Sequence, residues 1–154
     1  MAGLDTLDIL FVAFAFLFQI VLIIHFAVRR WAFDTAVHYG PLVYALSLPA
    51  LGLSIVQIGG GKPWTLWLAG FLYAAWALFG YWVEYARHID WRTSGHPIVF
   101  AVYIFLYLAT VMFYWWPLVT LYRPLWFVYG GLFIVATVLN VASHHPPART
   151  RHTG

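Results

Sequence analysis

Long apolar runs separated by short polar segments dominate the pattern of this chain. The first run, residues 9–28, carries no formal charge and ends at Arg29 and Arg30. About 20 residues in a helix rise about 30 Å, which is the thickness of the hydrocarbon core of a bilayer. Four more runs of similar length follow. The pattern predicts an all-α bundle of five transmembrane helices in one domain, residues 1–145, with spans at residues 9–28, 39–58, 64–85, 97–116 and 125–143.

Prolines, glycines and charged residues refine the boundaries of these predicted spans. Pro49 lies near the middle of the second predicted span, where the missing N–H and the ring predict a kink. The segment 59–63, GGGKP, ends that span. Asp5 and Asp8 precede the first span in place of a basic region, so we expect a retained helix and not a cleaved signal peptide. Residues 146–154 form a polar tail that we expect to be disordered.

The basic residues predict the orientation of the bundle. With five spans, six of the eight Lys and Arg residues fall on one side, and the other side holds Lys62 and Arg123. Basic residues are enriched in cytoplasmic loops. We therefore expect the N-terminus outside, the C-terminus in the cytoplasm, and the bundle in the inner membrane of a bacterium.

Composition narrows the functional classes. The chain is 64% hydrophobic and only 8% charged, and it contains no cysteine. Disulfides, thiolate metal sites and thiol redox chemistry are therefore excluded for this chain. Basic residues at span ends determine topology and do not indicate nucleic-acid binding. The expected partners are the lipid bilayer and a second copy of the chain or a larger membrane complex, and no nucleic acid.

Ionisable residues gather in the segment 81–97, YWVEYARHIDWRTSGHP. Arg87 and Arg92 are explained as topology signals, but acidic residues contribute little to orientation and Glu84 is left unexplained. Intramembrane ionisable residues are costly, so Glu84 is a functional candidate. On a continuous third helix, Glu84 and His88 would share one face at the spacing i, i+4. The expected partner of Glu84 is His88, Arg87 or His25.

Histidines also cluster at the predicted cytoplasmic end, where every predicted span brings at least one. Their amphipathic rings are tolerated at the level of lipid headgroups, which explains them without a function. A metal site would need three or four convergent ligands. Glu84, His88 and His25 are weak candidates, no HExxH motif occurs, and only His25 approaches the depth that a haem ligand would need. The sequence identifies no cofactor.

Polar positions form stripes on three predicted helices. The stripe of the fourth helix includes His96, Tyr103 and Tyr107, and that of the fifth includes Asn140 and His144. In lipid such faces turn inward. They serve either interhelical hydrogen bonds or a polar cleft that opens to the cytoplasm. The candidate ligand-binding residues are Glu84, His88, His25, His96, Tyr103, Tyr107, Asn140 and His144.

Three functions are compatible with this pattern. The first is a binding or transport protein, whose cleft takes a small ion, a polar solute or a lipid-like ligand with Glu84 as the proton or cation acceptor. The second is an accessory subunit of a membrane complex, in which the polar residues serve packing. The third is a metal-dependent membrane enzyme that uses the cluster of glutamate and histidines.

Overall fold

The computed structural model describes residues 3–89 and 96–143, and the predicted tail at 146–154 lies outside them. Within these ranges the chain is helical and has no strand. The segments are α1 (Thr6–Trp31), α2 (Phe33–Ala45), α3 (Ser47–Gly59), α4 (Trp64–Tyr81), the π-helix η1 (Trp82–Ala86), α5 (Pro97–Trp115), α6 (Leu118–Leu121) and α7 (Arg123–Ser143). They combine into five stretches that are long and apolar enough to span a membrane: Thr6–Trp31, Phe33–Gly59, Trp64–Ala86, Pro97–Leu121 and Arg123–Ser143. The all-α prediction with five such helices is confirmed.

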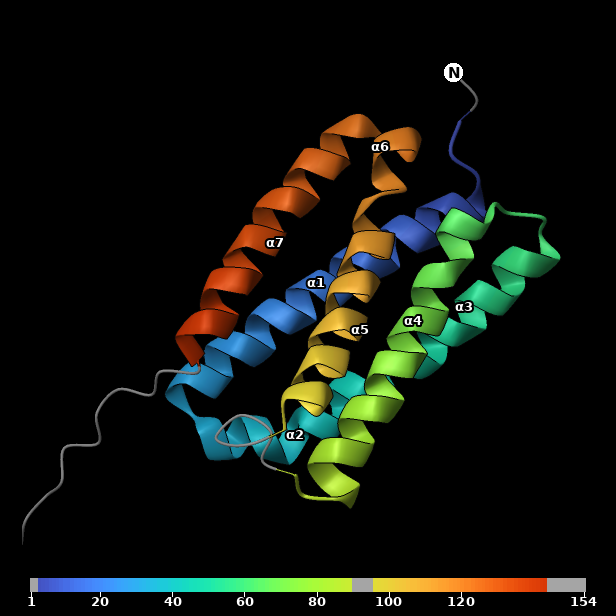
Figure 1. Ribbon diagram of the computed structural model, residues 1–154. Coiled ribbons are helices and arrows are strands. Elements are labelled where there is room, and N and C mark those ends of the chain that lie inside the picture. The colour runs from blue at the N-terminus through green and yellow to red at the C-terminus, as the bar shows by residue number, and fades with distance from the viewer. Residues whose placement is uncertain (1–2, 90–95, 144–154) are drawn as a thin grey trace, which may run out of the picture.

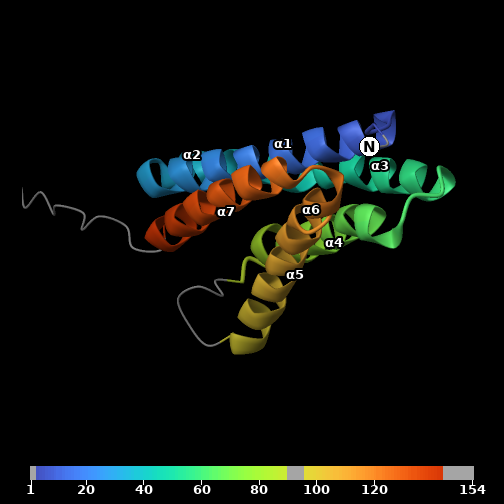
Figure 2. The same ribbon diagram turned by 90° about the horizontal axis from the view of Figure 1, so that it is seen from above.

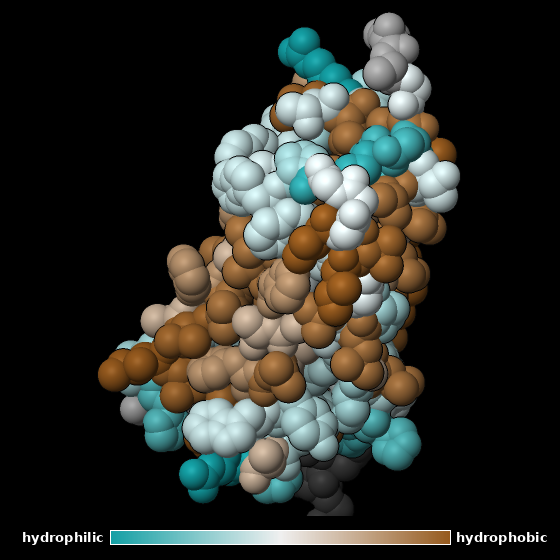
Figure 3. Space-filling view, turned by 90° about the vertical axis from the view of Figure 1, so that its right-hand side faces the viewer, coloured by the Kyte–Doolittle hydropathy of each residue, from teal (hydrophilic) through white to brown (hydrophobic). Residues whose placement is uncertain are grey.

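The helices run back and forth between two ends of the bundle (Figures 1 and 2). Arg29 and Arg30 lie in the last turn of α1, at the end of the bundle here called the arginine end. Lys62 lies in the connection between α3 and α4 at the opposite end, here called the lysine end. α1 packs along α7, and α4 packs between α3 and α5. In Figure 3 apolar residues spread across the middle of one face and polar residues lie toward its two ends. This is the surface that a bilayer-spanning bundle requires.

Aromatic side chains fill the centre of the bundle. The ring of Phe18 in α1 is fully buried and lies 4.6 Å from the Tyr73 ring and 5.1 Å from the Tyr114 ring, centroid to centroid. Beside this core, Gly70 of α4 lies against Ala50 and Ser54 of α3. Small residues allow two helices to approach closely, which is a common basis of helix packing in lipid.

A break divides the second predicted span into α2 and α3 at Leu46. Pro49 in α3 cannot donate to the carbonyl of Ala45, and its ring clashes with that carbonyl. The sequence predicts a kink at Pro49, and the structure has a break in the helix at Leu46, about one turn before the proline. The helix also begins earlier than expected, at Phe33, which places Pro41 inside α2 and not in a first turn.

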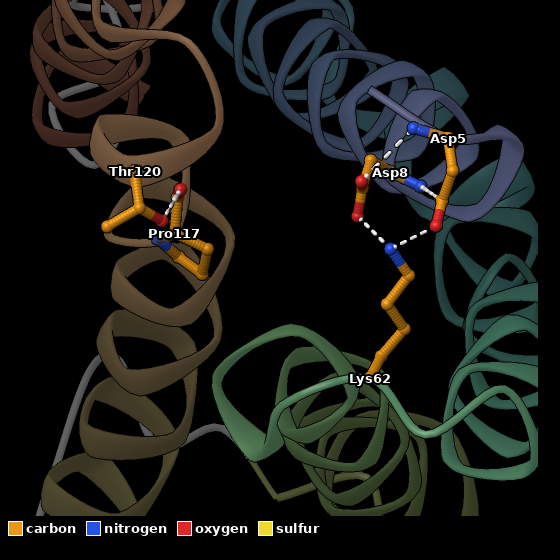
Figure 4. A network of polar contacts seen from close by, with 5 residues as sticks. All are labelled: Asp5, Asp8, Lys62, Pro117 and Thr120. Carbon is orange, nitrogen blue, oxygen red and sulfur yellow. Dashed lines mark hydrogen bonds and ion pairs between the residues drawn. The ribbon is translucent and has the colours of Figure 1, made fainter. Parts of the chain in front are cut away.

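An ionic clasp holds the lysine end together (Figure 4). Lys62 Nζ lies 2.6 Å from Asp5 Oδ2 and 2.6 Å from Asp8 Oδ1. Asp5 and Asp8 also cap the start of α1, since each carboxylate accepts from the backbone N–H of the other. Lys62 thereby ties the α3–α4 connection to the first turn of α1. The hydrogen bond from Lys62 lowers the pKa of Asp5, and the hydrogen bond to Asp5 raises the pKa of Lys62.

The clasp predicts a pH-dependent contribution to stability. Because the Asp5 pKa is lowered on folding, its contribution is present above the usual value of 3.8 and is lost as the pH falls below it. Because the Lys62 pKa is raised, its contribution is present below 10.5 and is lost as the pH rises above that value. We expect Lys62→Gln to be less stable than the wild type between these limits, and equally stable in acid. Unfolding of both proteins against pH measures this, and a constant difference across the pH range would contradict it.

At the arginine end, Arg30 links α1 to α7. Its Nη1 donates to the carbonyl of Ala142, at 3.2 Å, in the last turn of α7. The carbonyls of a last turn have no partner within the helix, and a cation there is favoured by the helix dipole. Arg30 therefore has a structural role that is separate from the pocket described below.

Candidate functional site

Glu84 lies where α4 changes into the π-helix η1, near the arginine end. A π-helical turn is wider than an α-helical turn, because each N–H donates to the carbonyl five residues earlier and not four. Here the N–H of Arg87 donates to the carbonyl of Trp82 at 2.9 Å. π-Helical turns of this kind occur frequently at functional sites. The helix ends at Ala86, and His88 adopts a left-handed backbone with φ of 51°. The expected i, i+4 geometry between Glu84 and His88 is therefore wrong, because no continuous α-helix joins them.

The carboxylate of Glu84 takes part in a chain of hydroxyl groups. The Tyr44 hydroxyl of α2 donates to Glu84 Oε2 at 2.8 Å and lies 3.1 Å from the Tyr103 hydroxyl of α5. With Glu84 ionised, Tyr103 donates to Tyr44 and Tyr44 donates to Glu84. With Glu84 protonated, every donor can reverse, because a hydroxyl both donates and accepts. The chain thus accommodates both charge states of the carboxyl group.

Tyr85, the next residue of η1, secures α2 beside this chain. Its hydroxyl donates to the carbonyl of Val37 at 3.0 Å. In a regular helix that carbonyl would accept from residue 41, but Pro41 has no N–H to donate. A methyl group at Gly40 would overlap the Tyr85 hydroxyl, so glycine is what allows the approach. Pro41 and Gly40 together create the position that Tyr85 occupies.

Trp76 of α4 forms the inner wall of the site. Its ring centroid lies 5.5 Å from that of Tyr44 and 5.7 Å from that of Tyr103. The space for Tyr44 depends on Gly80, because a Cβ there would lie 2.8 Å from Tyr44 Cζ. The two hydroxyl groups are thus held by close packing around their rings.

Two adjoining pockets open beside Glu84, and both are lined by His25, Arg29, Glu84 and Tyr85. The inner pocket also reaches Tyr44, Tyr103 and Trp76, and its volume of about 20 Å³ is room for about one water-sized molecule. The outer pocket is wider, about 40 Å³, and is completed by Phe33, Ala36 and Val37. The site can therefore take a small polar group inside and a larger one at the mouth.

The structure places the eight predicted ligand-binding residues in different positions. Three of them, Glu84, His25 and Tyr103, line the inner pocket. Tyr107 packs behind it, with its ring centroid 5.7 Å from that of Trp76 and its residue almost fully buried. His88 and His96 are exposed, Asn140 is partly buried in α7, and none of the three lines either pocket. His144 lies outside the described residues.

Sequence reasoning missed Tyr44 and Tyr85 and treated Arg29 as a topology signal. Prolines inside a span free a backbone carbonyl, and tyrosine is a donor that can reach one, so Pro41 was a usable signal for a nearby hydroxyl. Nothing in the spacing identifies Tyr85 as that donor. Tyr44 lies on none of the polar stripes that the sequence predicted, because those stripes are on the third, fourth and fifth predicted spans.

Among the metal candidates, Glu84 and His25 line the same pocket, whereas His88 has left the helix. Within residues 3–89 and 96–143, no three His, Asp or Glu side chains gather closely enough to hold a metal ion. The other polar groups that line the inner pocket with Glu84 are the imidazole of His25, the guanidinium of Arg29 and the hydroxyls of Tyr44, Tyr85 and Tyr103.

Comparisons with known proteins add no assignment to this geometry. The chain matches no protein-family model, and neither curated proteins nor solved structures gave a match.

Proposed function

We propose that the chain is a small integral membrane protein whose pocket faces the cytoplasm and binds a small polar ligand. Glu84 accepts the proton or the cationic group of that ligand. The orientation is supported by the sequence, in which the predicted five-span topology assigns six of the eight basic residues to one side. The same argument favours the inner membrane of a bacterium.

The observation that carries this proposal is the hydrogen bond from Tyr44 to Glu84 inside a pocket. A carboxylate within a helix that could span a membrane is expensive unless it is paired or serves a function. The groups that face it are Tyr44 from α2, Tyr103 from α5, Tyr85 from η1, and His25 and Arg29 from α1. A packing role alone would be served at lower cost by apolar residues.

Binding is better supported than transport. Both pockets adjoin Glu84 at the arginine end, whereas a transport path would need a polar connection to the lysine end. Between them lies the aromatic core around Phe18, whose ring is fully buried. The exposed apolar face of α7, which includes Ile134, Val138 and Val141, is proposed to contact lipid, a second copy or a larger complex.

Titration with ethanolamine, a small primary ammonium probe, tests the proposal. The full chain in lipid nanodiscs is expected to bind ethanolamine, and Glu84→Gln is expected to weaken binding at least about 10-fold, because a hydrogen bond to a charged group is lost. Asp34→Asn is the matched control, since Asp34 is an exposed carboxylate at the same end. Equal binding by the wild type and Glu84→Gln at neutral pH would refute the role of Glu84.

A further inference from the structure

The mouth of the site carries both signs of charge. Arg29 and Glu84 line the outer pocket together, with the imidazole of His25 beside them. An ion of either sign that enters this pocket meets one attractive and one repulsive charge. A ligand that carries both charges can place each of its ends beside the group of opposite sign.

We propose that the ligand is a phosphate ester that carries a primary ammonium group, as in the phosphoethanolamine headgroup. This rests on the function proposed above and specifies its ligand. The ammonium group occupies the inner pocket at Glu84 and Tyr44, and the phosphate occupies the outer pocket at Arg29.

The sizes of the two pockets support this arrangement. The inner pocket has room for about one water-sized molecule, which suits an –NH₃⁺ group and is too small for a trimethylammonium group. An ammonium group has three donors, and the acceptors inside are the Glu84 carboxylate and the tyrosine hydroxyls. The narrow inner pocket therefore predicts discrimination against choline.

The side chain of Arg29 is placed to bind the phosphate. Its Cζ lies 5.8 Å from the centre of the Phe33 ring, at the wider outer pocket. Guanidinium groups bind phosphate through paired hydrogen bonds and are preferred for that role. Arginine also keeps its charge at every physiological pH.

The mouth of the outer pocket is bordered by apolar side chains. Phe33 and Val37 line it, and each is about half exposed at the surface of α2. In a membrane, acyl chains attached to the phosphate could lie along this surface while the headgroup enters the pocket. The same chemistry also exists in free phosphoethanolamine, so the experiment includes both sources.

The first experiment compares soluble probes with the full chain in nanodiscs made of phosphatidylglycerol. Phosphoethanolamine is expected to bind at least about 10-fold more tightly than ethanolamine, because Arg29 adds a charge-assisted hydrogen bond. Phosphocholine is expected to bind more weakly than phosphoethanolamine. Arg29→Gln should remove the advantage of the phosphate, whereas Arg30→Gln should retain it, because Arg30 bonds to Ala142 outside the pocket.

The second experiment measures which lipid the chain retains. Native mass spectrometry after extraction from mixed bilayers is expected to find phosphatidylethanolamine retained over phosphatidylcholine, and retained less by Arg29→Gln. Binding of soluble phosphoethanolamine without lipid retention would identify the free compound as the source and would still support the chemistry.

The outcomes separate the two proposals. If ethanolamine binding depends on Glu84 but phosphate adds nothing and Arg29→Gln changes nothing, the ligand assignment is wrong and the proposed function stands. If Glu84→Gln binds ethanolamine as tightly as the wild type does, both are wrong. Equal binding of phosphocholine and phosphoethanolamine would also overturn the ligand assignment.

Discussion

Gly70→Ala is expected to destabilise the bundle by about 1–3 kcal/mol, the usual cost of forcing extra volume into a packed interface. The new Cβ would lie 2.5 Å from the carbonyl oxygen of Ala50 and would overlap the Ser54 hydroxyl. Because the first of these is a backbone atom, no rotamer change relieves the clash, and α3 must move away from α4. Unfolding of the wild type and the variant in detergent–lipid bicelles measures the difference.

Gly52→Ala provides the matched control in the same helix pair. Gly52 lies in α3, and a Cβ there has no neighbour within 4 Å. Alanine favours the helix over glycine by about 1 kcal/mol, so this variant should be as stable as the wild type or more so. A Gly70→Ala protein that unfolds like Gly52→Ala would show that α3 and α4 do not approach as closely as described.

Tyr44→Phe is expected to cost about 1–3 kcal/mol of stability, since it removes one hydroxyl and leaves two polar groups without that partner. Glu84 loses the bond of 2.8 Å, and Tyr103 loses the contact of 3.1 Å. The ring of phenylalanine retains the packing against Trp76, so the loss reports the hydroxyl alone. The same unfolding measurement applies, and the ethanolamine titration should show weaker binding.

Tyr107→Phe serves as the control for Tyr44→Phe. Tyr107 also packs against Trp76 and is buried, but its hydroxyl has no hydrogen-bond partner among the described residues. Its removal should leave stability unchanged or raise it, because no bond is lost and a buried polar group disappears. Equal losses from the two substitutions would mean that the Tyr44 hydroxyl contributes nothing specific.

The fold could be predicted from the sequence where the hydrophobic pattern extends over a whole span. Apolar length sets the five helices, and the missing N–H of Pro49 explains a break in the second span near that residue, so both could be predicted. The start of α2 at Phe33 could not, because Asp34 and His38 make its first turns polar and resemble a loop. The π-helical turn at Glu84 was not predicted either, because no residue pattern in the sequence distinguishes it from a regular α-helical turn.

The site was predictable in its central residue and less so in its surroundings. Glu84 stands out because charge inside a span is costly. Tyr103 lies on the polar stripe of the fourth predicted span, and His25 was a candidate because it lies about one turn inside Arg29. His88 and His96 were expected beside it on the assumption of regular helices, and the end of the helix at Ala86 places His88 elsewhere. Tyr44 and Tyr85 reach the site through the geometry of α2 around Pro41, which becomes visible only in three dimensions.

The central claim is that Glu84 binds the cationic group of the ligand within the pocket, and infrared difference spectroscopy tests it most directly. Ethanolamine added to the full chain in nanodiscs should change the carboxylate bands and a tyrosine C–O band. The carboxylate change should disappear in Glu84→Gln and persist in Asp34→Asn, and the tyrosine change should disappear in Tyr44→Phe. The same carboxylate change in Glu84→Gln as in the wild type would contradict the account, because another group would then bind the ligand.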